Sequence, residues 1–126
     1  MFDSSALISF LFGEAGAHTV EEALLEKDSV VYISAVDLGE VTYVVQQLSG
    51  DEAAVAVEAK VFETRKLHVV DATWLRVKQA ERLRREWKLS LPASICAGLV
   101  EEKQATLVTK NREFQGLQEE VAILWL

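Results

Sequence analysis

The chain has 126 residues, half of them hydrophobic, with one proline and one cysteine. It is long enough to bury a core without disulfides or a structural metal, and its composition excludes a disordered or low-complexity chain. The formal net charge is −7, from 13 basic and 20 acidic residues. A protein that holds nucleic acid by its overall charge is usually basic, so this balance argues against nonspecific electrostatic binding. It does not exclude a nuclease that meets phosphate through a metal ion.

The cysteine count and the hydrophobic runs bear on location. Cys96 is alone and cannot form an internal disulfide, which fits a reducing compartment. The first residues do not form a basic stretch followed by an apolar one, so no signal peptide is expected. The apolar runs, such as Ala6–Phe12 and Val30–Ile33, are too short to span a bilayer. We therefore expect a cytoplasmic protein without membrane association.

Short apolar runs alternate with longer amphipathic segments, which is typical of βαβ units around a parallel sheet. The expected strands are Met1–Asp3, Val30–Ile33, Leu67–Val70, Ala105–Thr109 and Val121–Trp125. The expected helices are Ser5–Phe12, Ala17–Glu26, Ala35–Leu48, Asp51–Arg65, Ala72–Trp87 and Pro92–Lys103. Linkers are short and no repeat is visible. We predict one domain over residues 1–126, an α/β fold with a three-layer α/β/α sandwich and a mainly parallel sheet of four or five strands.

Local signals mark where three helices begin. Ser34 followed by Asp37 resembles a capping box directly after a strand. Asp71 is expected to cap the helix from Ala72, and Pro92 suits the first position of its helix because proline lacks the N–H that would be unpaired there.

Polar residues follow the expected strands at the edge where sites form in open parallel sheets. Asp3 ends the first strand and is followed by two serines, and Glu40 lies in the second turn of the helix after Val30–Ile33. Taken alone, Asp3 is most simply a helix cap and Glu40 a solvated surface residue. Their chemical interest comes from the motifs in which they occur.

Four motifs occur in a fixed order along the chain. They are Asp3-Ser4-Ser5-Ala6-Leu7, Ser34-Ala35-Val36-Asp37-Leu38-Gly39-Glu40-Val41, Leu89-Ser90-Leu91-Pro92-Ala93, and Ala105-Thr106-Leu107-Val108-Thr109-Lys110-Asn111-Arg112-Glu113-Phe114. Each is weak alone, but in this order and spacing the chain resembles PIN-domain proteins, and among them the VapC toxins. The resemblance extends over essentially the whole chain, including the closing segment Val121–Leu126.

The resemblance implies a flavodoxin-like architecture and a Mg²⁺- or Mn²⁺-dependent ribonuclease. Such proteins cleave a phosphodiester with water activated at a cluster of three or four carboxylates, because these ions prefer oxygen ligands and lower the pKa of bound water. Carried over by position, Asp3 and Glu40 are the first and second acids and the metal ligands. Ser5 matches a hydroxyl that helps to hold the site, and Glu113 matches a trailing acid. An antitoxin partner, an RNA substrate and a homodimer are implied as well.

Two of the family's acids are replaced in this sequence. Ala93 stands where the Ser-Leu-x-Asp pattern has its aspartate, and Asn111 stands where the motif after the fourth strand has another. Asn111 keeps a neutral oxygen for the site, whereas Ala93 offers no ligand. One weakly held ion remains compatible with Asp3 and Glu40, but a two-metal site is disfavoured. We expect Asp3, Glu40, Asn111 and Glu113 to share one cleft, with Ala93 lining a gap and with weak or absent cleavage.

Other features have simpler interpretations. The segment from Arg76 to Lys88 carries six basic residues and two glutamates, which indicates either a solvated face or a rim that guides phosphate or an acidic partner segment. Trp74, Trp87 and Trp125 are interpreted as core or interface anchors rather than base-stacking platforms. Both histidines and Cys96 are interpreted as structural.

Three classes of function compete. The first is a PIN-type ribonuclease toxin of reduced activity, supported by Asp3 and Glu40. The second is a catalytically inactive protein of the same fold that binds RNA or a partner without cleavage, supported by Ala93 and Asn111. A phosphoacceptor receiver module is disfavoured because Ser4 and Ser5 stand where a second acid would be needed. The apolar segment Ala6–Phe12 and the helical face of Asp51–Arg65 favour a homodimer.

Overall fold

The computed structural model describes residues 1–126 and contains the predicted alternation of helices and short strands. The strands are β1 (Val31–Ser34), β2 (Leu67–Val70), β3 (Leu107–Thr109) and β4 (Ile123–Trp125). The helices are α1 (Ser4–Leu11), α2 (Ala17–Leu25), α3 (Ala35–Ser49), α4 (Asp51–Glu63), α5 (Trp74–Trp87), α6 (Leu91–Lys103) and the 3₁₀ helix η1 (Arg112–Leu117). The sequence predicted every one of these elements except η1. For β2 the predicted bounds are the same as the observed ones.

All strand pairs are parallel. β1 pairs with β2 in the register Val31 to Leu67, and β3 pairs with β4 in the register Leu107 to Ile123. Phe2 joins the two pairs, because it forms parallel bridges with both Ile33 and Val108. The predicted strand Met1–Asp3 is therefore reduced to one bridging residue, and the order across the sheet is β2, β1, Phe2, β3, β4. This confirms a parallel sheet between helical layers.

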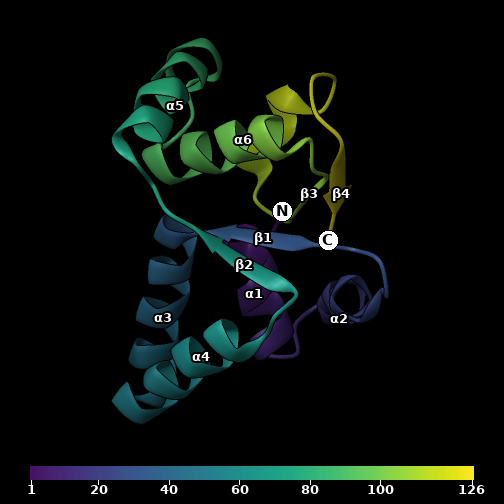
Figure 1. Ribbon diagram of the computed structural model, residues 1–126, viewed down its shortest axis with the longest axis vertical. Coiled ribbons are helices and arrows are strands. Elements are labelled where there is room, and N and C mark those ends of the chain that lie inside the picture. The colour runs from purple at the N-terminus through teal and green to yellow at the C-terminus, as the bar shows by residue number, and fades with distance from the viewer.

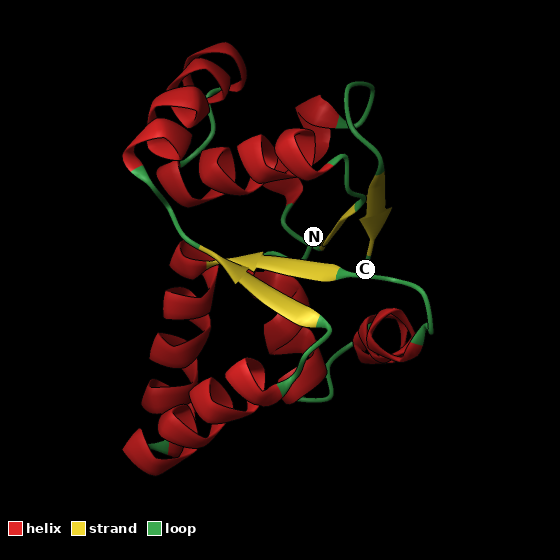
Figure 2. Cartoon of the chain, in the orientation of Figure 1, coloured by secondary structure: helices red, strands yellow, loops and turns green.

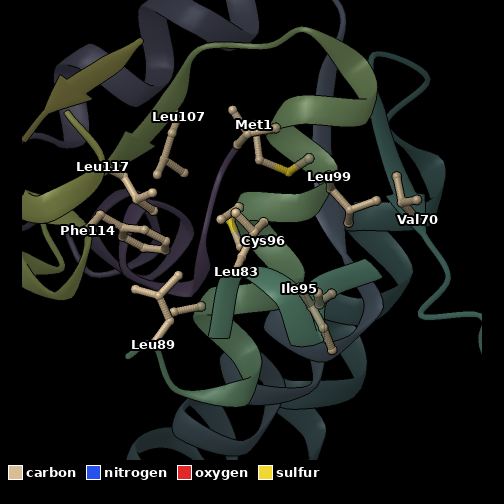
Figure 3. Close-up of a cluster of buried hydrophobic side chains, with 14 residues drawn as sticks. Met1, Val70, Leu83, Leu89, Ile95, Cys96, Leu99, Leu107, Phe114 and Leu117 are labelled. Atoms are coloured by element: carbon tan, nitrogen blue, oxygen red, sulfur yellow. The ribbon is translucent and has the colours of Figure 1, made fainter. Parts of the chain in front are cut away.

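Two hydrophobic clusters cover the two faces of the sheet. Figures 1 and 2 show α5 and α6 on one side and α1 to α4 on the other. Met1 and Leu107 belong to the cluster under α5 and α6, shown in Figure 3, whereas Phe2 and Val108 belong to the cluster under α1 to α4. Successive residues of a strand point to opposite faces of the sheet. Met1 and Leu107 therefore pack in one layer, and the residues that follow them, Phe2 and Val108, pack in the other.

Helix starts follow the capping chemistry of the sequence, with two corrections. Ser34 accepts a hydrogen bond from the backbone N–H of Asp37 (2.9 Å), as predicted. The predicted cap by Asp71 is wrong, because Thr73 caps α5 by accepting from Arg76 N–H (3.3 Å), and α5 begins at Trp74. Ser90 caps α6, which begins at Leu91, so Pro92 occupies its second position rather than its first.

None of these helices combines the length and the apolar character that crossing a bilayer requires.

Phe2 offers a direct test of the central strand. Its side chain is 1 % exposed, and its backbone bridges both halves of the sheet. We expect Phe2→Ala to lower the free energy of unfolding by about 3–5 kcal/mol, because a large aromatic ring leaves a cavity in the core. Phe62→Ala is the matched control, since Phe62 on α4 is 64 % exposed and its loss should change stability by about 0.5 kcal/mol or less. Urea unfolding measures both, and similar losses in the two variants would contradict this assignment.

Candidate active site at the carboxyl edge of the sheet

Asp3 is the centre of a buried hydrogen-bond network. It lies at the N-terminus of α1 and is 3 % exposed. Its Oδ1 accepts from the hydroxyl of Ser5 (2.6 Å) and from the backbone N–H of Ala6 (3.0 Å), and its Oδ2 accepts from the hydroxyl of Thr109 (2.6 Å). The start of α1 also favours a negative charge through the helix dipole. The cap interpretation and the site interpretation of Asp3 are therefore compatible.

The two hydroxyls that donate to Asp3 are themselves held by the backbone after β3. Ser5 Oγ accepts from the N–H of Lys110 (3.0 Å), and Thr109 Oγ1 accepts from the N–H of Asn111 (2.9 Å). Each hydroxyl is polarised by the donor behind it, which strengthens its own hydrogen bond to the carboxylate. The network thus ties the first motif to the fourth across the sheet, and the supporting role of Ser5 in an active site stays a prediction.

Asn111 and Glu113 continue the network toward α6. Asn111 caps η1 by accepting from Glu113 N–H (3.0 Å), and its Nδ2 donates to Glu113 Oε2 (3.4 Å). Glu113 also accepts from the backbone N–H of Ser90 and from the Ser90 hydroxyl (3.1 Å). Ala93 follows in the first turn of α6, where its N–H donates to Ser90 Oγ (3.3 Å). Asp3, Ser5, Asn111 and Glu113 are therefore linked by one chain of contacts that reaches the helix turn of Ala93.

Glu40 does not take part in this network. It is exposed in the second turn of α3 and forms neither a side-chain hydrogen bond nor an ion pair. No group of three or more histidine, cysteine, aspartate or glutamate side chains is arranged to hold a metal ion. The role of Glu40 as a second ligand stays a prediction.

Asp37 is the acid at this edge that sequence reasoning did not select. It is 4 % exposed, and its Oδ2 accepts from the Ser34 hydroxyl (3.1 Å). Burial and the negative charge of Asp3 raise the pKa of Asp37 to about 7, although hydrogen bonds from Ser34, Ser4 and Cys96 oppose the rise. Burial and the same two carboxylates raise the pKa of the Cys96 thiol. A capping motif indicates only local contacts, so the pairing of Asp37 with Asp3 required the fold.

A second missed pair lies beside Ser5. The ammonium of Lys110 contacts Glu14 Oε1 (2.8 Å), and Ser9 donates to the same oxygen (3.4 Å). This ion pair, together with the Ser9 hydrogen bond, lowers the pKa of Glu14. The two residues are 96 positions apart, and no local pattern in the sequence connects them. The pair joins the loop after α1 to the loop after β3 at the rim of the network.

The donor set fits at most one weakly held divalent ion. Asp3 Oδ1 already accepts two hydrogen bonds, whereas Oδ2 accepts one and keeps a lone pair for a ligand bond. Glu40 is exposed and unengaged, so its carboxylate is free to turn. Mg²⁺ is often held by only one or two protein carboxylates and several waters, which this set satisfies. Two ions would need more acids than the two proposed ligands, Asp3 and Glu40, provide.

Comparisons with known proteins bear on the family and the fold of this chain. The family model described as the PIN domain matches residues 1–120. Curated proteins give no match. Among solved structures, Mycobacterium tuberculosis VapC20, described as a sarcin-ricin loop cleaving toxin, superposes with a TM-score of 0.74 at 23 % identity over 91 % of this chain and 92 % of that one.

Two further solved structures share the fold. A toxin-antitoxin complex from Klebsiella pneumoniae gives a TM-score of 0.71 at 20 % identity, covering 98 % of this chain and 93 % of that one. VapBC2 from Rickettsia felis, bound to a DNA fragment from its promoter, gives 0.74 at 17 % identity, covering 100 % and 97 %.

The raised pKa of Asp37 predicts a pH dependence of stability. Its pKa rises from 3.8 to about 7 on folding, so its protonated form stabilises the fold. This stabilisation is complete below about pH 4 and is lost as the pH rises through about 7. Asp37→Asn is neutral throughout, so the variant should gain stability relative to the wild type by up to about 1.4 kcal/mol for each pH unit in that window. Urea unfolding at pH 5 and pH 7.5 measures this gain.

Asp28→Asn is the control for that experiment, because Asp28 is exposed. Its stability should follow the wild-type pH profile. If the stability of Asp37→Asn changes with pH in the same way as that of the wild type, Asp37 is ionised in the folded protein and the assignment is wrong.

Proposed function

We propose that this chain, which belongs to the PIN-domain family, is a ribonuclease of the VapC toxin type with a degenerate acidic site, folded as a single PIN domain over residues 1–126. The observation that carries the proposal is the buried Asp3 network at the carboxyl edge of the sheet. Asp3 is held there by donors from both the first and the fourth motif. The fold shared with VapC20, described as a sarcin-ricin loop cleaving toxin, supports RNA as the proposed substrate class.

Each residue of the site has a proposed role. Asp3 and Glu40 would hold one Mg²⁺ or Mn²⁺ ion, which when bound would polarise a phosphate oxygen and lower the pKa of a coordinated water. Ser5 and Thr109 hold the Asp3 carboxylate in one orientation, because each donates to a different oxygen. Asn111 and Glu113 line the same network and would orient a water or a ribose hydroxyl through their oxygens.

Cleavage is proposed to be weak, because Ala93 and Asn111 stand where the family has acids and both make structural contacts instead. Ala93 is buried in the apolar cluster under α5 and α6. Asn111 donates to Glu113, a contact that an aspartate at this position would turn into repulsion. These two observations favour the alternative function, a catalytically inactive PIN-fold protein that binds RNA or a partner without cutting.

An antitoxin and a second copy of the chain are the proposed protein partners. The toxin-antitoxin complexes among the structural neighbours support the first. Apolar side chains exposed on α3 and α4 support the second; they are Tyr43, Leu48, Val55 and Phe62. A shallow apolar groove of about 230 Å³ between α1, α2 and α4 offers a further surface, lined by Leu7, Phe10, Leu24 and Val57. A cytoplasmic location belongs to the same proposal, because the proposed RNA substrate and antitoxin are intracellular.

Restoring both acids tests the degenerate site. The double variant Ala93→Asp with Asn111→Asp should bind Mn²⁺ more tightly and cleave RNA faster than the unmodified protein. Without metal it should melt at a lower temperature, because it places carboxylates beside Glu113 and within an apolar cluster. Metal should then recover the loss, since an ion that binds only the folded state stabilises it. Thermal melts with and without Mn²⁺, paired with cleavage of a structured RNA, measure both effects.

Gln47→Glu with Gln118→Glu is the control, because it adds the same two charges at exposed positions away from the network. It should change neither the metal response nor cleavage. Robust cleavage by the unmodified protein that survives Asp3→Ala would show that this network is not the active site.

A further inference from the structure

Trp74 was expected to be a core or interface anchor, and its exposure excludes the core. Its side chain is 75 % exposed, whereas Trp87 and Trp125 are half-buried against the cluster under α5 and α6. Trp74 is the first residue of α5, which starts just after β2 at the carboxyl edge of the sheet. Figure 1 shows β1 and β2 both ending on the side where α3 and α5 begin. A large aromatic ring is therefore open to solvent at the edge that also holds Asp3.

The free cations of α5 lie on the same face as Trp74. The segment Arg76–Lys88 has six basic residues, and Arg76, Arg82 and Arg84 are each bonded to a glutamate (2.9, 2.8 and 3.3 Å). Lys78, Arg85 and Lys88 form no ion pair and are exposed. At 3.6 residues per turn, Lys78 and Arg85 lie within about 40° of Trp74 around the helix axis. We call Trp74, Lys78 and Arg85 the α5 stripe.

The opposite face of α5 explains why the stripe points outward. Ala80 and Leu83 are buried in the cluster under α5 and α6, and they lie about 120° and 180° from Trp74 around the helix axis. The stripe is therefore not a displaced part of the core. The depression between α5 and α6 has Lys78 at its wall as well, but its two arginines, Arg76 and Arg82, are ion-paired with Glu102 and Glu101. Its interior is therefore a poorer place for phosphate than the stripe.

We propose that the α5 stripe binds a single-stranded stretch of RNA, with an unpaired base stacked on Trp74 and backbone phosphates beside Lys78 and Arg85. A stacking ring with cations along one line is the combination that single-stranded nucleic acid recognises. The stripe spans about 16 Å along the helix, at 1.5 Å per residue. That length covers about five stacked nucleotides at roughly 3.4 Å each. An acidic peptide would use the cations but would leave the exposed ring without a partner.

This inference rests on RNA as the proposed substrate class, and it assigns binding to an element outside the Asp3 network. The protein carries a net charge of −7, but the unpaired cations Lys78 and Arg85 give this face of α5 a locally positive charge. The binding is expected to depend strongly on salt, as phosphate contacts release counterions.

The test uses a fluorescein-labelled 12-nucleotide oligouridine and fluorescence anisotropy with EDTA present, so that binding is measured without metal-dependent cleavage. Trp74→Ala should weaken binding by at least about fivefold, and Trp74→Phe should retain most of it because a phenyl ring also stacks. Tyr43→Ala is the control for a general loss of exposed aromatic surface, since Tyr43 on α3 is 60 % exposed, and it should bind as the wild type does.

The cations are tested by the salt dependence of the same binding. Lys78→Gln with Arg85→Gln should reduce the slope of log affinity against log salt by about 1.4, which is the value for two phosphate contacts to a single strand. Arg82→Gln is the matched control, because Arg82 is exposed on α5 but bonded to Glu101, and it should leave the slope nearly unchanged.

The outcomes separate this inference from the proposed function. If the wild type binds and cleaves RNA while Trp74→Ala and the double glutamine variant bind equally well, the stripe assignment fails and the nuclease proposal stands. If Trp74→Ala instead dissociates a dimer in sedimentation and leaves RNA affinity unchanged, the stripe is a protein interface and the assignment also fails. If the wild type binds neither oligouridine nor structured RNA at low salt, both proposals fail.

Discussion

The architecture of the carboxyl edge depends on keeping one buried carboxylate, that of Asp3, hydrogen bonded at both of its oxygens. The donors come from α1 and from the end of β3, and Phe2 directly before Asp3 is the residue that joins the two halves of the sheet. A buried charge that loses a donor costs more than the hydrogen bond itself contributes, because the charge is then left unsolvated. The residues that position the site are therefore the same residues, or direct neighbours of the residues, that hold the sheet together.

The periodicity of the sequence was enough to predict the layers, since amphipathic helices and short apolar strands alternate along the whole chain. Errors arose where side-chain capping decided a boundary. Thr73 rather than Asp71 caps α5, and Asn111 starts η1 by accepting from Glu113 N–H. The motif indicates Asn111 as a replaced acid that keeps a neutral oxygen for the site, and it does not indicate the capping role of that oxygen or the 3₁₀ turn. Trp74 was interpreted as a core or interface anchor, and its exposure follows from its place as the first residue of α5, two residues after the predicted start.

The electrostatics of the site were harder to predict than its membership. Motif order identified Asp3, Ser5, Asn111 and Glu113, which the fold links in one network. It did not identify Asp37 as a second buried carboxylate beside Asp3, because that pairing joins the start of α1 to the start of α3. A count of acids by motif position gives Asp3 and Glu40. A count by burial and proximity gives Asp3 and Asp37, with Glu40 at the surface.

Ala93 and Asn111 also make contacts at this edge that involve no cation. Four carboxylates gathered around one cleft repel each other until an ion bridges them. Here Ala93 contributes to the apolar cluster, and Asn111 donates to Glu113, so both positions stabilise the edge without an ion. The α5 stripe does not include any of these residues, and its cations are free of the carboxylates in the network. The proposed metal ligands and the proposed RNA-binding stripe therefore lie on separate elements. On this proposal, substitutions at positions 93 and 111 weaken cleavage and leave the α5 stripe unchanged.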